Sequence, residues 1–191
     1  MSMRSMSSRL TCLVPLALVL ACASCASKPP RSPQAAPALV LAPQPGWIVE
    51  PPANAMRKAQ YSLPRAEGDS EDASLIVHSF GGQGGSREAN LERWAGQFEQ
   101  TDGSSSADKL ESSTRTIAGL KVFVAELSGT YVAETAPGSG VHVNKPGWRM
   151  LAAIVDTREG PWYFKLVGPA ATIAKWEASY ETFLSELAPG N

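Results

Sequence analysis

The sequence predicts an α+β fold, in which two amphipathic helices pack on an antiparallel β-sheet of about six to seven strands. Short segments with the alternating or continuous apolar pattern that is typical of strands occur as a run of three and a run of four. A helix follows each run, because apolar residues at 86–98 and at 172–187 recur every three or four positions. Runs of strands separated by helices favour antiparallel pairing with the helices packed on the sheet.

The first run of strands begins near Trp47. Residues 56–64, MRKAQYSLP, alternate in polarity as a half-buried strand does, and Pro64 ends that strand. A turn with four acidic residues, 65–72, then leads to ASLIVHSF at 73–80, whose apolar character predicts a buried strand. These segments form the first part of the predicted sheet.

A glycine-rich loop, FGGQGGSRE at 80–88, joins the buried strand to the first helix. A strand, a glycine loop and a helix N-terminus can together hold a phosphate, but neither G-x-x-x-x-G-K-[ST] nor G-x-G-x-x-G is present. Arg87 in the first helical turn opposes the helix dipole, so a nearby carboxylate or a bound anion would relieve it. We predict a structural joint; the alternative is an anion or ligand site made of Gly84, Gly85, Ser86 and Arg87.

The first helix has an apolar and a polar side. Ser86 is a suitable N-cap, and one apolar stripe contains Leu91, Trp94, Ala95 and Phe98. The polar side contains Asn90 and Arg93. That side is either simply solvated or the contact surface for a protein partner.

The second half of the chain supplies the other strands and the last helix. Strands at 110–117 and 120–134 flank a tight Ala118–Gly119 turn, and strands at 148–157 and 161–168 flank the turn REG, with a glycine/proline loop at 134–147 between the pairs. The last helix has the strongest helical pattern in the chain. Its apolar face consists of Ile173, Trp176, Tyr180, Phe183, Leu184 and Leu187.

The N-terminus predicts export. A short basic segment is followed by an apolar run at 10–21, which is too short to span a bilayer but suits a signal peptide. The next residues, VLAC at 19–22, resemble the lipobox of bacterial lipoproteins, in which the cysteine is acylated and becomes the new N-terminus. Cys22 fits this pattern better than Cys25, because Val19 occupies the aliphatic position. The alternative is cleavage by a general signal peptidase, which releases a soluble secreted protein.

We therefore divide the chain into a signal peptide at 1–21, a lipid anchor with a Pro/Ala-rich linker at 22–45, and an α+β domain at 46–191. Loss of residues 1–21 removes two of 17 basic residues and leaves 15 against 18 acidic ones, which argues against nucleic-acid binding. The histidines are His78 and His142, and the sequence contains no G-x-S-x-G or H-E-x-x-H motif. The residues thus predict no catalytic group, no metal and no cofactor.

The order of elements, with GLKVFVAELSGTY, YFKLVGP and the closing WEASYETFLSEL helix, resembles the PsbP-like superfamily, which includes DcrB-type envelope lipoproteins. The resemblance covers roughly residues 46–188 and implies a PsbP-like α/β sandwich and an envelope location, but no chemistry. We expect a noncatalytic module, lipid-anchored in the outer membrane and facing the periplasm, that binds an unknown envelope protein or a small molecule. The alternative is an envelope enzyme of unrecognised type, or an anion-binding protein that uses the 81–87 glycine loop.

Overall fold

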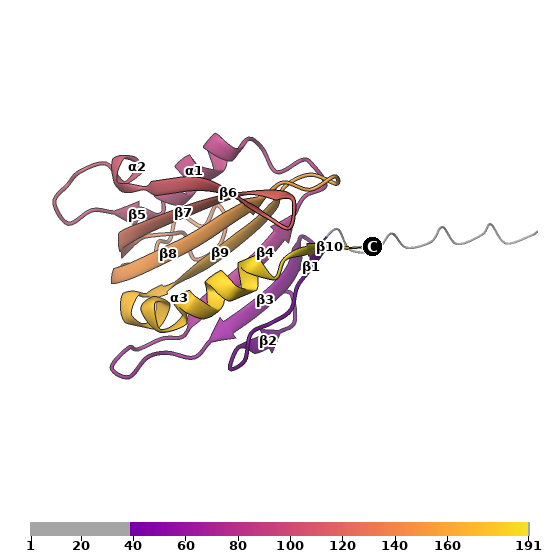
Figure 1. Ribbon diagram of the computed structural model, residues 1–191. Coiled ribbons are helices and arrows are strands. Elements are labelled where there is room, and N and C mark those ends of the chain that lie inside the picture. The colour runs from indigo at the N-terminus through magenta and orange to yellow at the C-terminus, as the bar shows by residue number, and fades with distance from the viewer. Residues whose placement is uncertain (1–38, 191) are drawn as a thin grey trace, which may run out of the picture. The chain divides into compact units, whose positions relative to one another are not determined.

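The computed structural model describes residues 39–190, which form an antiparallel sheet with helices on its two faces (Figure 1). The α+β fold class is therefore confirmed. The elements in chain order are β1 Leu39–Val40, β2 Ile48–Glu50, β3 Arg57–Leu63, β4 Ala73–Ser79, α1 Arg87–Ala95, β5 Phe98–Glu99, α2 Ser106–Lys109, β6 Glu111–Ile117, β7 Leu120–Tyr131, β8 Lys145–Val155, β9 Trp162–Pro169, α3 Ala170–Ser185 and β10 Ala188–Pro189.

The main sheet has eight strands, one more than the upper limit of the prediction. Its order is β2-β3-β4-β9-β8-β7-β5, and β6 pairs with the first part of β7. The extra strand is β5. It consists of Phe98 and Glu99, which pair with Tyr131 and Thr130.

Phe98 was expected at the end of the first helix, but that helix ends at Ala95. The chain turns through Gly96 and Gln97, and Phe98 reaches the same apolar cluster as Trp94 from a strand. The helical spacing of Phe98 therefore correctly predicted that this residue is buried, but wrongly predicted that the helix extends to it. The sequence analysis also predicts no helix between Phe98 and the strand that begins at residue 110, whereas the structure has the single-turn helix α2 there.

The face of the sheet covered by α3 holds the larger core. The predicted apolar stripe of this helix is confirmed: Trp176 is half-buried, and the other five side chains are buried against strands β3, β4, β8 and β9. Phe183 lies near its centre, with ring centroids 5.1 Å from Trp47, 6.0 Å from Tyr61 and 6.0 Å from Phe164. Aromatic packing of this kind anchors the helix to the sheet.

The opposite face is covered by α1. Trp94 and Ala95 pack with Met150, Ile154 and Tyr163 of the central strands. The central strands thus have apolar side chains on both faces, which is why β8 and β9 carry nearly continuous apolar runs rather than alternating ones.

The domain begins earlier than the predicted boundary at residue 46. Leu39 is buried in the α3-side core, and β1 pairs with β10, so that Leu39 lies opposite Pro189 and Val40 opposite Ala188. The apolar segment within the predicted linker is therefore part of the domain. This segment is proline-rich, but Leu39 and Val40 pair with β10 in a separate two-stranded sheet.

The acidic turn before β4 helps to begin α3. The carboxylate of Asp69 accepts hydrogen bonds from the backbone N–H of Thr172, at 2.8 Å, and from its hydroxyl, at 2.5 Å. The hydroxyl of Thr172 in turn accepts from the backbone N–H of Ala66 at 2.9 Å. Because Pro169, the N-cap residue of α3, makes no side-chain capping bond, Asp69 satisfies an N–H that the helix leaves free.

Candidate functional site

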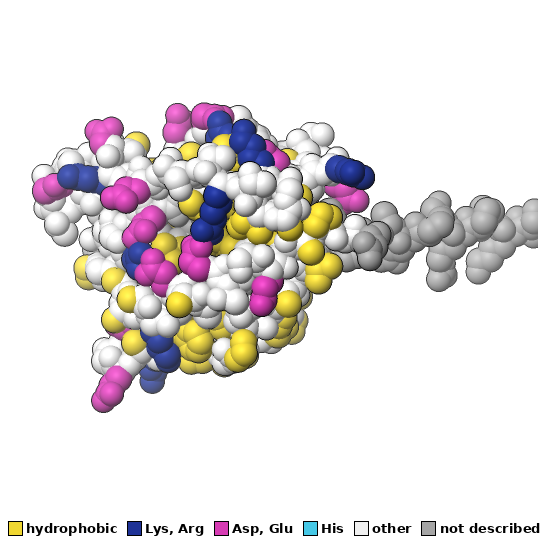
Figure 2. Space-filling model, in the orientation of Figure 1, with side chains coloured by type: hydrophobic (Ala, Val, Ile, Leu, Met, Phe, Trp, Pro, Cys, Tyr) yellow, Lys and Arg dark blue, Asp and Glu magenta, His cyan; other side chains and the backbone are white. Residues whose placement is uncertain are grey.

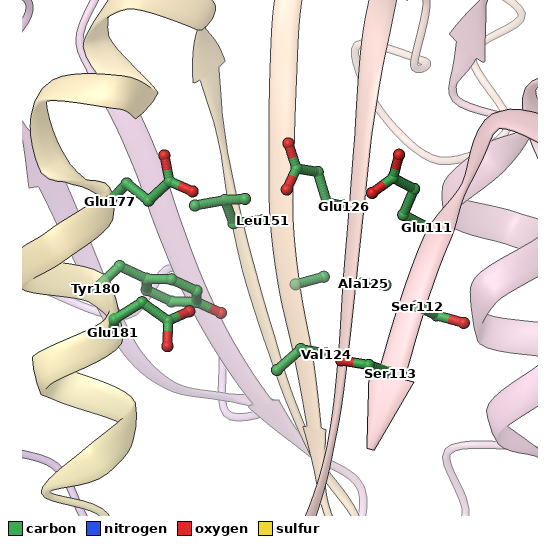
Figure 3. A pocket seen from close by; sticks show the side chains of 11 residues that line it. Glu111, Ser112, Ser113, Val124, Ala125, Glu126, Leu151, Glu177, Tyr180 and Glu181 are labelled. Atoms are coloured by element: carbon green, nitrogen blue, oxygen red, sulfur yellow. The ribbon is translucent and has the colours of Figure 1, made fainter. Parts of the chain in front are cut away.

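A groove lies between α3 and strands β6, β7 and β8, with a volume of about 210 Å³. Figure 3 shows side chains of α3 extending toward those of the strands across this groove. We call it the acidic groove, because glutamates are the most frequent of its lining residues: Glu111, Glu126, Glu177 and Glu181, together with Ser112, Ser113, Val124, Ala125, Leu151, Ala152 and Tyr180.

Local periodicity brings these carboxylates together. On β6, alternation places Glu111 on the same face as Ile117, which packs against the α3-side core. On β7, Glu126 shares its face with Val122 and Val124. On α3, Glu177 and Glu181 are four residues apart and therefore lie on one side of the helix.

Arg149 of β8 holds one end of the groove. Its Nη1 and Nη2 donate to the two oxygens of Glu177, each at 2.8 Å, and its Nε donates to Glu126 at 2.6 Å. These bonds raise the pKa of Arg149, and they lower the pKa of Glu177. This bidentate contact between Arg149 and Glu177 fixes the distance between α3 and the sheet.

Glu111 and Glu126 lie directly opposite each other on β6 and β7. Carboxylates in such a pair repel each other, which destabilises the sheet unless a cation lies nearby. Arg149 compensates Glu126. In the part of the chain that the structure describes, no ion pair or hydrogen bond engages the carboxylate of Glu111.

The other end of the groove has unused hydrogen-bonding groups. Nη1 of Arg115 contacts Glu181 at 2.6 Å, while its Nε and Nη2 are buried without partners among the described residues. Tyr180 is 1% exposed, and its hydroxyl, which lines the groove, has no partner within residues 39–190. Burial, with a further contribution from Glu181, raises the pKa of Tyr180, so the hydroxyl remains a neutral donor.

The surface around the groove shows the same charges. In Figure 2, acidic and basic side chains gather beside hydrophobic ones on the face that contains α3 and β6. Four glutamates line the groove. Arg149 pairs with two of them, Glu126 and Glu177, and Arg115 pairs with a third, Glu181. The groove therefore has an excess of negative charge and suits a cationic group.

The glycine loop is a joint with internal partners. The Gly84 carbonyl accepts from the Asn90 side chain at 2.8 Å, and the Ser86 hydroxyl accepts from Ala89 N–H at 3.1 Å, which confirms the predicted N-cap. The Gly85 carbonyl accepts from the Tyr163 hydroxyl at 3.3 Å.

Arg87 has the two neighbours that relieve its position in the first helical turn. It pairs with Glu88 at 2.6 Å and lies 3.9 Å above the Phe123 ring. The predicted protein carboxylate is thus present. A ligand role for Gly84, Gly85, Ser86 and Arg87 stays a prediction.

The surface role predicted for Asn90 is wrong. Asn90 is fully buried, and its amide donates to the carbonyls of Gly84 and Ser86, so it fastens the glycine loop to α1. An asparagine on the polar side of a helix was mistaken for a solvated one, because the loop that covers it folds back over that side. Arg93 is exposed and hydrogen-bonds to the Asn90 side-chain oxygen, so its predicted partner role remains open.

The two histidines lie on different elements of the fold. His78 is half-buried on β4 and stacks on Phe80 with ring centroids 5.6 Å apart. Burial, followed by Arg57, Arg93 and Lys165, lowers its pKa. His142 lies in the 134–147 loop, where its backbone forms an isolated antiparallel β-bridge with that of Glu134. The five tryptophans are buried or half-buried and pack in the two cores, as the apolar helix faces predicted for Trp94 and Trp176.

Sequence reasoning did not identify the acidic groove. One signal was available, since Glu126 occupies the apolar face of an otherwise well-patterned strand. Its neighbours come from β6, β8 and α3, which only the fold brings together. Within residues 39–190, no group of three or more His, Cys, Asp and Glu side chains is arranged to hold a metal ion. None of the helices in that range combines the length and apolarity required to cross a membrane.

Comparisons with known proteins add two structural similarities. No protein-family model and no curated protein sequence matches the chain. A crystal structure of a protein of unknown function from Pseudomonas aeruginosa is similar over 76% of this chain and 98% of its own, with 13% identity and a TM-score of 0.46. The solution structure of cyanobacterial PsbP (CyanoP) from Synechocystis sp. PCC 6803 is similar over 80% of this chain and 86% of its own, also with 13% identity and a TM-score of 0.46. At these values neither similarity assigns a family or an activity to the chain.

Proposed function

We propose that the protein is a noncatalytic module of the bacterial envelope, anchored by a lipid at Cys22, that binds a cationic group in the acidic groove. The cation is a primary amine or a guanidinium, carried by a partner protein or by a small molecule. The observation that supports this most directly is the Glu111–Glu126 pair, in which one carboxylate lacks a counterion in the described part of the chain. A bound cation would replace repulsion with attraction at this position.

The groove also provides two acceptors of different strength. The Glu111 carboxylate accepts charge-assisted hydrogen bonds, and the oxygen of the buried Tyr180 hydroxyl accepts a weaker one if the cation reaches it. The remaining lining includes Val124 and Leu151, which contact the methylene groups of an arginine or lysine side chain. At about 210 Å³ the groove suits one side chain, since pockets for drug-sized ligands are usually larger.

Binding can be tested with arginine amide and with citrulline amide, which has nearly the same shape and no charge on its side chain. We expect arginine amide to bind to the full-length protein and citrulline amide to bind much more weakly. Glu111→Gln should lower the affinity for arginine amide by only about three- to tenfold, because the site is partly open to water. Glu92→Gln, an exposed change on α1, is the matched control and should leave the affinity unchanged. Equal binding of both amides, or an unchanged affinity in Glu111→Gln, would contradict the proposal.

The anchor is tested separately. Cys22 lies outside the described residues, and its role rests on the lipobox-like VLAC segment. In the native host, the mature protein should occur in the membrane fraction and carry acyl mass on Cys22, because several acyl chains bind a membrane firmly. Cys22→Ala should remove that mass and release the protein from the membrane fraction, whereas Cys25→Ala should change neither. An unmodified Cys22 in the wild-type protein would exclude the anchor while leaving the groove to be judged by its own test.

A further inference from the structure

A second polar cluster lies on the opposite face of the sheet, around Lys165 of β9. Lys165 lies opposite Ile76 and Ala152 in the sheet, on the face covered by α1. Its amine donates to the Gln97 side-chain oxygen and lies 3.3 Å from the Tyr131 hydroxyl. Both contacts are to neutral groups.

The charged groups around Lys165 are of one sign. Arg93 approaches from α1, and His78 from β4 has Arg57 opposite it on β3. Arg93 and Arg57 donate to the side-chain oxygens of Asn90 and Gln60, and Nε of Arg57 is buried without a partner. Within residues 39–190, none of these cationic side chains forms an ion pair with a carboxylate.

Such a cluster is costly for the fold alone. Burial, followed by the charge of Arg93, lowers the pKa of Lys165 to about 7. A methionine fills a similar volume without this cost, so stability does not explain a lysine here. Lys165 is half-buried and lacks a carboxylate partner, and groups whose pKa is perturbed in this way are more typical of binding sites.

An open depression adjoins the cluster. Its volume is about 440 Å³, and its lining includes Arg93, Gln97, Tyr131 and His142. The side chains of Gln97 and Tyr131 contact Lys165, so the amine lies directly behind this lining. One carboxylate, Glu134, also lines the depression, but its oxygens accept from the backbone N–H groups of Gly138 and Gly140 at 2.7 and 3.3 Å.

We propose that this depression binds a small oxyanion, a phosphate or a carboxylate, beside Arg93, with Lys165 behind the Gln97 and Tyr131 side chains. The two cations neutralise the anion, and the side-chain N–H of Gln97 and the hydroxyl of Tyr131 donate further hydrogen bonds to its oxygens. The site is distinct from the acidic groove, because it lies on the α1 face and shares no residue with it.

Binding at this site should take up a proton. An anion favours the charged amine, so it raises the pKa of Lys165 from about 7. Near pH 6 the amine is mostly charged, and the affinity for acetate, which itself stays ionised from there upward, should change little with pH. Above pH 7 each bound anion requires a proton, and affinity should fall by up to about tenfold per pH unit.

Isothermal titration calorimetry of the full-length protein with inorganic phosphate, and separately with acetate, tests this proposal. At pH 8 the apparent enthalpy should differ between buffers of different ionisation enthalpy, because proton uptake draws on the buffer. Lys165→Met should remove that difference and weaken binding at least tenfold, which is about 1.4 kcal/mol. Arg93→Gln should weaken binding but retain proton uptake, and the exposed Lys58→Met should behave as the wild type. The two anions separate phosphate from carboxylate recognition.

Several results would overturn the inference. One is the absence of binding of both anions at pH 6, where the Lys165 amine is mostly charged. Another is binding that Lys165→Met and Arg93→Gln leave unchanged. Because Arg93 is exposed, its replacement tests the site even if Lys165→Met perturbs the fold.

Discussion

Replacement of Phe183 by alanine is expected to lower the free energy of unfolding by about 3 to 5 kcal/mol. Phe183 is 1% exposed and contacts Trp47, Tyr61 and Phe164, so its removal leaves a cavity between α3 and the sheet. Three aromatic pairs are lost together with the buried area. Urea denaturation followed by circular dichroism measures the effect.

The same substitution at Phe80 is the matched control. Phe80 is half-buried at the end of β4 and packs on the other face of the sheet, against His78 and Tyr163. Phe80→Ala should therefore lower the free energy of unfolding clearly less than Phe183→Ala does. Equal losses at the two positions would mean that the α3-side core is not the main source of stability.

Replacement of Gly160 by alanine is expected to destabilise the protein by about 2 to 5 kcal/mol. Gly160 lies in the β8–β9 turn with φ of +104°, a backbone conformation that alanine rarely adopts. An added Cβ would lie 2.5 Å from the nitrogen and 2.7 Å from the Cα of Gly82, so the turn and the glycine loop would have to separate. Thermal unfolding followed by circular dichroism measures the loss of stability, and the summed fluorescence of the five tryptophans of the folded protein reports rearrangement around them.

Gly138→Ala separates backbone strain from this close contact. Gly138 also has a positive φ, of +72°, but an added Cβ would meet nothing within 4 Å. We expect a loss of about 1 to 2 kcal/mol and no change in the tryptophan fluorescence of the folded protein. If Gly160→Ala costs no more than Gly138→Ala, the contact between the turn and the glycine loop contributes nothing to stability.

The elements with a long, regular pattern could be predicted from the sequence. Helix α3 and strand β3 have apolar residues at fixed spacing, because each has one face in the core and one outside. The strands that were missed are two residues long. Strands β1, β5 and β10 have no periodicity to detect and form only because a partner edge is available.

The two sites could not be predicted for a different reason. Each residue of the acidic groove is ordinary in its own segment, and Glu177 or Glu181 alone reads as the solvated side of a helix. Their shared property is position relative to β6 and β7, which the packing of α3 on the sheet determines. Lys165 similarly appears as one polar residue in an apolar strand, and its cationic neighbours come from other elements.

The pairing of β1 with β10 places the beginning and the end of the described chain side by side (Figure 1). A short peptide could therefore join the two ends, and new ends could be opened in the exposed 101–103 turn between β5 and α2, which contributes to neither site, without cutting a strand of the main sheet. Such a circular permutant would keep the groove and the Lys165 cluster intact. It would also move the point of attachment to another corner of the domain, so that the orientation of the two sites toward a surface could be changed independently of their chemistry.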